Sequence, residues 1–321
     1  MNLIVAGGAG FIGSNFVRNA ISGIYGNFSK ITVLDKLTYA GNLANFSKNQ
    51  FKEIEFIEGN ITDIDLMNKL SKTNDVLINF AAESHVDRSI LGSRVFVESN
   101  IMGVQTILDS IRNGKITTLI QVSTDEVYGS ISTGSWSEDF PLMPNSPYAA
   151  SKASGDLLCK AFHKTYGIDV RITRCSNNYG PYQYPEKIIP LFITNLIQGK
   201  NIPIYGNGLN VRDWLHVDDH CRAINMVLKK GKPGEIYNIG GGRELTNLDL
   251  TYKILELMKI DVNRIDFVGD RLGHDLRYSV NYNKIASELG YSPSINFEIG
   301  IIETVNWFID NKSWWENLVK K

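Results

Sequence analysis

The stretch that decides the fold is Leu3-Ile4-Val5-Ala6-Gly7-Gly8-Ala9-Gly10-Phe11-Ile12-Gly13. Its four apolar residues predict a buried strand, and its glycines form the pattern G-x-G-x-x-G, counted from Gly8, at the start of a predicted helix. Glycine suits these positions because the turn needs positive φ and because a Cβ would hold the backbone away from a pyrophosphate. The helix N-terminus then offers free N–H groups to an anion. The stretch predicts a dinucleotide-binding turn.

A carboxylate follows this turn at an informative distance. Asp35 ends the second predicted strand, about twenty residues beyond Gly13. A carboxylate there accepts hydrogen bonds from an adenosine ribose and repels a 2′-phosphate. The glycine pattern alone is also compatible with an ordinary strand-to-helix turn, but the strand, loop, helix and acid together favour a cofactor site. We therefore expect NAD rather than NADP.

Apolar strands and amphipathic helices alternate through the first half of the chain. Strands are predicted over 3–6, 31–34, 54–57, 76–80, 118–123 and 170–173, and helices over 11 to about 24, 63–70, 95–111 and 147–166. After Arg174 the chain becomes rich in turns. The fold class is therefore α/β, a doubly wound parallel (Rossmann) sheet with a smaller C-terminal α/β substrate domain. We assign 1–176 and about 209–243 to the NAD-binding domain, and 177–208 and about 244–321 to the substrate domain.

Composition excludes several classes of protein. The 321 residues include 33 basic and 34 acidic side chains, so the chain lacks the positive charge that nucleic-acid or membrane binding requires. The three widely spaced cysteines, Cys159, Cys175 and Cys221, form neither a disulfide framework nor a zinc site, so no metal is expected. The short run at 3–6 is no signal peptide or membrane span. We expect a cytoplasmic protein.

A group of reactive side chains lies where the strand over 118–123 ends. Thr124, Asp125 and Glu126 follow this strand at the sheet edge where ligands bind in open parallel sheets. Tyr148 and Lys152 share one face of a predicted helix. An adjacent ammonium and a cationic nicotinamide would lower the pKa of Tyr148 and let it take a proton from a hydroxyl group. Alone, this spacing is more often an amphipathic helix face; downstream of the cofactor turn, it indicates catalysis.

These stretches together resemble the extended short-chain dehydrogenase/reductase family, and within it the nucleotide-sugar 4,6-dehydratases that act on thymidine diphosphate-glucose. The matching stretches cover 7–14, 35–42, 79–89, 123–129, 148–152, 177–190, 210–214 and 270–278. Two departures are Asn60, where the family usually has Asp, and Leu272, where it usually has Pro. Neither touches the reactive groups.

The resemblance implies a dehydration in which NAD is regenerated within each turnover and stays tightly bound. The sugar C4 hydroxyl gives its proton to Tyr148 and its hydride to NAD. Glu126 then removes the C5 proton and Asp125 protonates the departing C6 hydroxyl, before hydride returns to C6. Thr124 shares a hydrogen bond with the substrate, and Lys152 orients the nicotinamide ribose.

The resemblance also implies the binding residues. Cofactor contacts are expected at Gly7, Gly10, Phe11, Ile12, Gly13, Asp35, Lys36, Leu37, Thr38, Asn60, Ile61, Phe80, Ala81, Ala82, Ser84, Ser99, Tyr148, Lys152 and Asn178. Contacts to the nucleotide sugar, dTDP-glucose, are expected at Ser84, Thr124, Asn177, Lys187, Ile188, Pro203, Ile204, Tyr205, Arg212, Asn247, Asp270, Arg271, His274 and Tyr278. A guanidinium suits a diphosphate, although Arg212 taken alone could instead form a local ion pair with Asp213.

Several alternatives remain open at this point. A nucleotide-sugar 4-epimerase usually has small residues where Asp125 and Glu126 stand, and a guanosine diphosphate-mannose dehydratase usually keeps the Glu without the preceding Asp. A catalytically silent NAD-binding sensor commonly lacks the Tyr or the Lys. The family implies a homodimer through the helices near 95–111 and 147–166. Preference for thymidine over uridine and the final deoxysugar, for instance in a dTDP-rhamnose-type pathway, leave no pattern in the sequence.

The implied roles carry a structural corollary. Side chains alternate along a strand, so Thr124 and Glu126 would face one way and Asp125 the other. All three cannot serve one pocket from a continued strand. We therefore predict that the strand stops near Ser123 and that the chain turns through Thr124–Glu126. Downstream, Thr246 or Asn247 should cap a helix after the turn formed by the glycines at 240–242.

Overall fold

The computed structural model describes residues 1–319 of the chain. Its strands are β1 (Asn2–Ala6), β2 (Lys30–Asp35), β3 (Glu55–Glu58), β4 (Val76–Asn79), β5 (Thr118–Thr124), β6 (Asp169–Cys175), β7 (Asn177–Tyr179), β8 (Ile202–Tyr205), β9 (Val211–His216), β10 (Ile236–Ile239), β11 (Glu244–Thr246) and β12 (Ile265–Val268). Its helices are α1 (Phe11–Ile21), α2 (Lys48–Lys52), α3 (Ile64–Ser71), α4 (Val86–Leu91), α5 (Arg94–Val97), α6 (Gly103–Arg112), α7 (Pro147–Tyr166), α8 (Ile188–Ile197), α9 (Val217–Lys230), α10 (Asn247–Met258), α11 (Asn283–Leu289), α12 (Phe297–Asp310) and α13 (Lys312–Trp315). Shorter helical turns are η1 (Leu43–Asn45), η2 (Glu98–Met102), η3 (Asp125–Tyr128) and η4 (Val262–Arg264).

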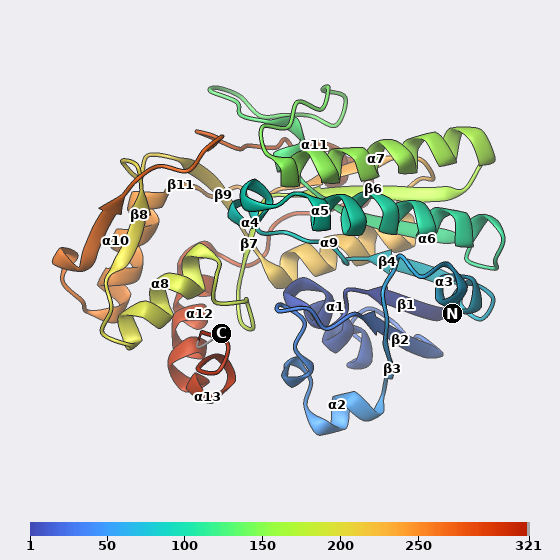
Figure 1. Cartoon of the computed structure of the whole chain (residues 1–321), viewed down its shortest axis with the longest axis horizontal. Coiled ribbons are helices and arrows are strands. Elements are labelled where there is room, and N and C mark those ends of the chain that lie inside the picture. The colour runs from blue at the N-terminus through green and yellow to red at the C-terminus, as the bar shows by residue number, and fades with distance from the viewer. Residues whose placement is uncertain (320–321) are drawn as a thin grey trace.

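Seven parallel strands form the central sheet, in the order β10-β6-β5-β4-β1-β2-β3 (Figure 1). Pairs such as Leu3 with Ile31 and Leu3 with Val76 fix the register around β1. This order is that of a dinucleotide-binding sheet with β10 added at one edge. The predicted fold class is confirmed.

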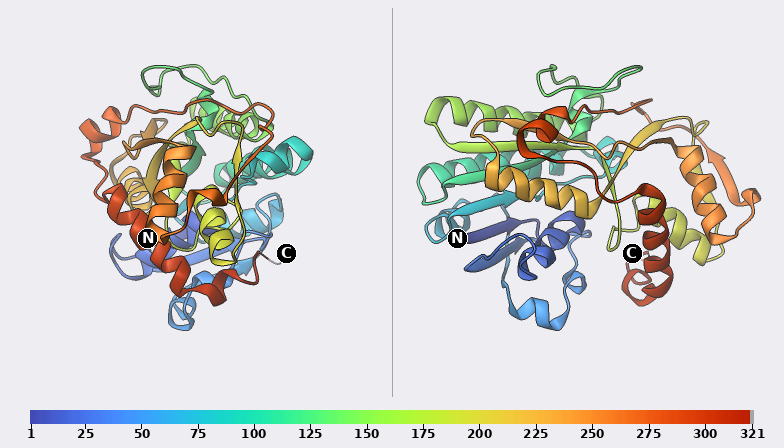
Figure 2. Two further views of the ribbon diagram at one scale, coloured as in Figure 1. Left: turned by 90° about the vertical axis from the view of Figure 1, so that its left-hand side faces the viewer. Right: turned by 180° about the vertical axis from the view of Figure 1, so that it is seen from behind.

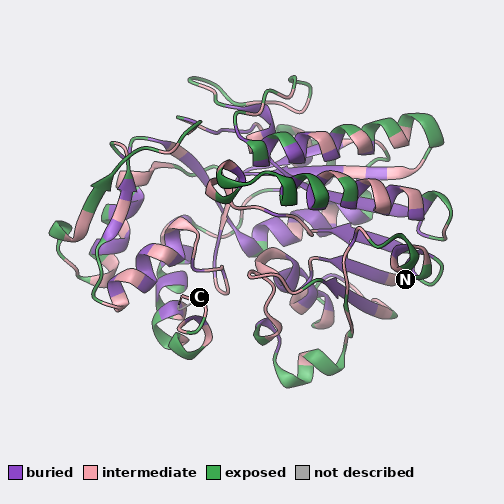
Figure 3. Cartoon of the chain, in the orientation of Figure 1, coloured by how far each residue is buried: buried purple, intermediate pink, exposed green. Residues whose placement is uncertain are grey.

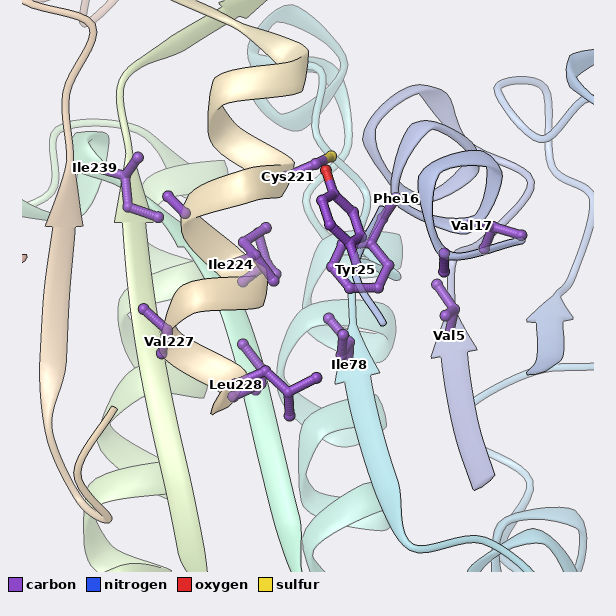
Figure 4. Close-up of a cluster of buried hydrophobic side chains, with 14 of the residues drawn as sticks. Val5, Phe16, Val17, Tyr25, Ile78, Cys221, Ile224, Val227, Leu228 and Ile239 are labelled. Atoms are coloured by element: carbon purple, nitrogen blue, oxygen red, sulfur yellow. The ribbon is translucent and has the colours of Figure 1, made fainter. Parts of the chain in front are cut away.

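Helices cover both faces of this sheet because its central strands are apolar on both sides. α3, α6 and α7 pack on one face, with Leu77 of β4 in their core. α1 and α9 pack on the other face (Figure 2). Figure 4 shows Ile224 and Leu228 of α9 among the side chains that fill this second core, together with Ile78 of the sheet.

The smaller part of the molecule lies beyond the carboxyl ends of the sheet strands (Figure 1). It contains the β12-β8 pair, the β11-β9-β7 sheet and the helices α8, α10, α12 and α13. Phe192, Ile254, Ile301 and Trp315 are buried in its core. It therefore stands at the edge where the reactive residues were expected.

The packing of α11 differs from the proposed division into domains. Ile285 and Leu289 of α11 lie in the core of the central sheet, although residues 244–321 were assigned to the substrate part. The reason is that α11 follows a long strand-free segment that returns along the molecule to α9 and β10. β9 also departs from the division, because it pairs with β7 and β11 of the smaller part although about 209–243 was assigned to the NAD-binding domain. Elsewhere the division stays a prediction.

One predicted helix is interrupted. In place of a helix over 95–111, the chain forms α5, a π-helical turn at η2, and α6. The π turn contains Asn100, whose side chain bonds the backbone of Glu83 and the hydroxyl of Ser151. Sequence periodicity does not reveal a turn of this kind because it inserts a single residue into an otherwise regular helix.

Within residues 1–319, no helix is both long and apolar enough to cross a membrane.

Candidate active site

The glycine turn is shaped for close approach to a ligand. Gly7 has a φ of 72°, and a Cβ there would lie 2.5 Å from the backbone nitrogen of Ala81. A Cβ on Gly13 would collide with the carbonyl oxygen of Gly7. Gly10 caps α1 without a side-chain hydrogen bond, so the first N–H groups of this helix face outward from the turn. These features fit a pyrophosphate.

A cleft opens beside this turn and collects most of the predicted cofactor residues. It is lined by Gly7, Gly10, Leu34, Asp35, Lys36, Thr38, Ala40, Gly41, Gly59, Asn60, Ile61, Phe80, Ala81, Ala82 and Ser99. Four of these residues, Leu34, Ala40, Gly41 and Gly59, were not predicted from the sequence, although Ala40 and Gly41 belong to a stretch that matched the family. Phe11 and Ile12 pack against the apolar core instead of lining the cleft.

Asp35, at the end of β2, is hydrogen-bonded to the backbone of the glycine turn. Its two carboxylate oxygens accept N–H groups from Ala9 and Leu37, each at 2.9 Å. Burial raises the pKa of Asp35, and the two N–H bonds act against this shift. Each oxygen keeps a further lone pair, so the carboxylate can also accept ribose hydroxyls, as predicted for NAD.

The predicted end of the fifth strand is confirmed. β5 stops at Thr124, and Asp125–Tyr128 form a 3₁₀ turn. The Thr124 hydroxyl accepts the N–H of Glu126 at 3.3 Å, which starts this turn. The turn frees Asp125 and Glu126 from the alternation of a strand. Because a catalytic role is predicted for Asp125 and Glu126, η3 (Asp125–Tyr128) is called the catalytic turn.

The surroundings of Asp125 favour its neutral form. Its pKa is raised well above the usual range, chiefly by burial and then by the negative charge of Glu126. Its Oδ1 contacts the hydroxyl of Thr124 at 3.3 Å, whereas Oδ2 is buried and has no hydrogen-bond partner among residues 1–319. A protonated carboxyl with a free oxygen can act as an acid.

Glu126 has cationic surroundings instead. Burial raises its pKa, and the positive charges of Arg212, Arg271 and Lys187 act in the opposite direction. The Tyr278 hydroxyl lies 3.5 Å from its Oε2. An ionised carboxylate near the working pH can act as a base.

Tyr148 and Lys152 are both buried on α7. Burial, and next the charge of Glu126, raise the pKa of Tyr148 well above 10, while a hydrogen bond with Thr124 acts the other way. Lys152 donates to the carbonyl oxygen of Val122 at 2.7 Å, and burial lowers its pKa. The sequence predicted a lowered pKa for Tyr148. Within this chain the net shift is upward, so the protein alone does not produce the predicted lowering.

Arg212 does not form the local ion pair that its neighbour suggested. Its guanidinium donates to the carbonyl oxygens of Val211 and Asp275, at 2.8 and 3.0 Å, and lies 4.5 Å from the centroid of the Tyr278 ring. Asp213 points to the other face of β9 and accepts N–H groups from the loop that follows β10. Arg212 thus keeps its charge beside Glu126.

Other predicted substrate residues reach across from the smaller part of the molecule. Lys187, at the start of α8, donates to the carbonyl oxygen of Ser84 at 2.8 Å. Arg271 lies 3.4 Å from Asp87, whose carboxylate also accepts from Tyr205 at 3.3 Å. Asp87 belongs to a stretch that matched the family, yet the sequence analysis did not single it out.

The remaining predicted residues occupy varied places. Asn177 begins β7, Ile188 begins α8 and Asn247 begins α10 after Thr246, whose side chain caps that helix as predicted. His274 contacts Asp270 at 2.7 Å. Pro203 lies on β8. The side chain of Asn178 contacts that of His220 at 2.9 Å. The side chain of Ile204 is buried in the core of the smaller part, so only its backbone could meet a ligand.

The fold and this site define a class of protein: NAD-binding Rossmann enzymes that carry a Tyr-x-x-x-Lys helix and act on a second ligand held by a C-terminal part. Comparison with known proteins makes the assignment specific. The chain belongs to the family described as GDP-mannose 4,6 dehydratase, whose model matches residues 4–304.

Individual relatives match nearly the whole chain. A dTDP-glucose 4,6-dehydratase from Actinoplanes sp. is 54% identical over 319 residues, covering 98% of this chain and 100% of the relative. The crystal structure of DesIV, the dTDP-glucose 4,6-dehydratase of Streptomyces venezuelae with NAD bound, is 54% identical, with a TM-score of 0.98 over 99% of this chain and 100% of that one. A UDP-glucose 4-epimerase from Thermotoga maritima is 28% identical, with a TM-score of 0.90 over 97% and 100%.

Proposed function

We propose that this chain is a dTDP-glucose 4,6-dehydratase that uses tightly bound NAD to form dTDP-4-keto-6-deoxyglucose. One observation carries the proposal: two neighbouring buried carboxyl groups on the catalytic turn differ in their charged surroundings. After burial, negative charge is the main influence on the pKa of Asp125, whereas three cations lower the pKa of Glu126. Removal of water from adjacent carbons needs one acid and one base. The similar dehydratases support the choice of substrate.

The cofactor fits the described cleft. The turn at Gly7 to Gly13 and the N–H groups of α1 would hold the pyrophosphate, and Asp35 would hold the adenosine ribose. When bound, NAD supplies a hydride acceptor for the sugar C4 and a hydride donor for C6. Lys152 would orient the nicotinamide ribose with its remaining N–H groups.

The side chains of the chain move the protons. Tyr148 accepts the proton of the C4 hydroxyl, with Thr124 bonded to the same oxygen. Glu126 removes the proton from C5, which a ketone at C4 makes acidic. Asp125 donates a proton to the departing C6 hydroxyl, so that water leaves and a C5–C6 double bond forms. As C6 receives hydride, C5 takes back a proton, so the net reaction is the loss of water. Each positioned group contributes roughly 10²–10⁴-fold.

The principal alternative is a nucleotide-sugar 4-epimerase. An epimerase transfers hydride at C4 and has no need of an acid and a base at C5 and C6. The environments of Asp125 and Glu126 therefore argue for the dehydratase, as does the lower identity to the epimerase structure, 28% against 54%. A silent NAD-binding sensor would not keep Tyr148 and Lys152 buried beside the catalytic turn.

The experiment is a turnover assay without added cofactor. Purified protein is incubated with dTDP-glucose, and the alkaline absorbance of a 4-keto-6-deoxy sugar is followed. We expect product without added NAD. UDP-glucose and GDP-mannose serve as competing donors, compared by kcat/KM; a higher value for either would overturn the choice of substrate, and epimerised sugar without dehydration would favour the epimerase.

We also propose a homodimer formed by the outer faces of α4 to α7. Figure 3 shows exposed positions along these helices. Their exposed large apolar residues include Leu91 with 88%, Met102 with 58% and Leu157 with 56% of its surface accessible. Exposed large apolar side chains on neighbouring helices support an interface at this place. Because the three cysteines are buried and unpaired, we place the enzyme in the reducing cytoplasm, where its product would serve deoxysugar synthesis such as a dTDP-rhamnose-type pathway.

A further inference from the structure

The catalytic carboxyl groups are weakly held by their own side-chain contacts. Within the described residues 1–319, the side chain of Asp125 makes one hydrogen bond, at 3.3 Å with Thr124, and that of Glu126 makes one, at 3.5 Å with Tyr278. Contacts of this length orient a carboxyl group poorly. The positions of both groups therefore depend on the backbone of the catalytic turn and on whatever holds its two ends.

One end of the turn is held by β5, and the other by a buried polar cluster. Tyr128, the last residue of the turn, is 1% exposed. Its hydroxyl accepts a hydrogen bond from Nη1 of Arg174 at 2.7 Å and donates one to Oδ1 of Asn238 at 2.9 Å. The Arg174 guanidinium also lies 4.7 Å from the centroid of the Tyr128 ring. Ring and hydroxyl are thus fixed from two strands, β6 and β10.

The same arginine reaches the helix that carries the other reactive groups. Nε of Arg174 donates to Oδ2 of Asp156 at 2.9 Å, and both side chains are almost completely buried. Asp156 lies four residues beyond Lys152 and eight beyond Tyr148 on α7, so the three share one side of the helix. Arg174 projects from the same face of β6 as Val170 and Ile172, which pack toward α7.

Stability alone does not explain this cluster. A buried ion pair is often no more stable than apolar residues of similar volume, because both charges lose their hydration. Here the second oxygen of Asp156 is buried without a hydrogen-bond partner among residues 1–319, which adds to the cost. Burial lowers the pKa of Arg174, but the charge of Asp156 and the interactions with Tyr128 together raise it above its usual value, so the guanidinium stays charged.

We propose that Tyr128, Arg174 and Asp156 are positioning residues that set the catalytic turn, with Asp125 and Glu126, against the part of α7 that carries Tyr148 and Lys152. The inference rests on the proposed function. Oxidation at C4 uses groups on α7, whereas loss of the C5 proton and the C6 hydroxyl uses groups on the turn. Removal of a hydrogen bond within the cluster should therefore lower the rate of elimination and leave the rate of oxidation at C4 unchanged.

The test is a single turnover of the enzyme with its bound NAD, quenched at intervals and analysed by mass spectrometry. Three sugars are distinguished: the substrate, the C4 ketone that still carries its C6 hydroxyl, and the 4-keto-6-deoxy product. In Tyr128→Phe, which keeps the ring and removes the hydroxyl, we expect the C4 ketone to accumulate because elimination slows by roughly 10²-fold, the effect of a displacement of about 1 Å. The rate of oxidation should stay that of the wild type.

Tyr237→Phe is the matched control. Tyr237 is a buried tyrosine of β10 whose hydroxyl also makes two hydrogen bonds, with the N–H of Lys232 and the carboxylate of Glu288, away from the catalytic turn. It should lose comparable thermal stability without accumulating the ketone. A purely structural role for the cluster predicts the same partition between ketone and product in both variants, and that result would overturn the proposal.

A second variant covers the case in which Tyr128→Phe fails to fold. The double variant Arg174→Met/Asp156→Leu removes both buried charges together, which such sites tolerate, and keeps Tyr128. It should also accumulate the C4 ketone; a folded double variant that partitions like the wild type contradicts the inference. If the wild type forms neither the C4 ketone nor the 4-keto-6-deoxy product, the proposed function fails. If the wild type forms product and the variants partition between ketone and product as it does, only the positioning role is refuted.

Discussion

At the residue scale, the site depends on the difference between two adjacent carboxyl groups. Asp125 is buried beside another carboxylate, while Glu126 faces Arg212, Arg271 and Lys187. In sequence the two differ by one methylene group. Their distinct roles arise from burial and neighbouring charge, which shift the two pKa values by different amounts.

This difference predicts a bell-shaped pH dependence of the elimination rate. Glu126 must be ionised, so the rate falls as the pH drops through a pKa above the ordinary 4.5. Asp125 must be protonated, so the rate falls again as the pH rises through its own raised pKa. Single-turnover rates across pH should lose the acid limb in Glu126→Gln and the alkaline limb in Asp125→Asn, each with an elimination rate lower by roughly 10²–10⁴-fold. An unchanged profile in either variant contradicts the assigned role.

The same shift predicts a pH-dependent gain in stability for Asp125→Asn. The folded protein prefers the protonated carboxyl, so the stabilisation by Asp125 is fully present below the ordinary pKa of 3.8 and is lost as the pH rises through the folded-state pKa. The neutral amide does not ionise. The unfolding midpoint of the variant should therefore exceed that of the wild type by an amount that grows with pH. Asp139→Asn, an exposed site, is the control, and a gap that does not vary with pH would refute the explanation.

At the element scale, the strand–turn–helix from β1 to α1 binds through its backbone. Gly13 is where α1 passes closest to the turn, because the position of a Cβ there is already taken by the carbonyl oxygen of Gly7. Side-chain chemistry contributes little at this place. The strand–turn–helix can bind a pyrophosphate because Gly8, Gly10 and Gly13 have no side chains to hold the backbone away from it.

Gly13→Ala should therefore release the cofactor. We expect the purified variant to carry less than about a tenth of the wild-type NAD, because relief of the clash moves the N–H groups that face the pyrophosphate. The measurement is the NAD freed from denatured protein by each variant. Gly92→Ala is the control, since a Cβ there meets no atom within 4 Å. Full NAD content in Gly13→Ala would mean that the turn tolerates a side chain.

At the scale of the whole molecule, the smaller part completes a site that the central sheet only begins. Lys187 and Arg271 come from segments beyond β7 and place their charges beside Glu126 of the sheet edge. Arg271 contacts Asp87 and Lys187 contacts Ser84, so both sit against loops of the Rossmann part. The residues predicted for cofactor and substrate thus meet between the two parts.

The exposed face of α4 to α7 predicts the oligomeric state. Leu157→Glu should shift the enzyme from dimer toward monomer, because a charge would be buried without a partner at the proposed interface. Light scattering after size exclusion measures this shift. Leu209→Glu is the control, since Leu209 is also 56% exposed but lies in the smaller part. A wild-type monomer, or equal effects of both substitutions, would contradict the proposed interface.

The elements of the central sheet could be predicted from sequence, and so could the family. The helix over 147–166 matches α7 in both bounds, since its apolar spacing, its Pro147 and its Gly167 are local signals. The end of β5 also followed from local reasoning about side-chain alternation. The π turn at η2 and the return of α11 to the central sheet could not be predicted, because neither changes the periodicity that a sequence displays.

By itself, the sequence determined the strand–helix alternation, the glycine turn, the acid at Asp35 and the reactive residue types at 124–126, 148 and 152, since each depends on near neighbours in the chain. Only the tertiary structure decided how burial and charge shift the two carboxyl pKa values, which cations surround Glu126 and which buried arginine links the catalytic turn to α7. These properties depend on burial and on contacts between residues far apart in sequence. Desolvation and Coulomb interactions act through space, and no spacing along the chain encodes them.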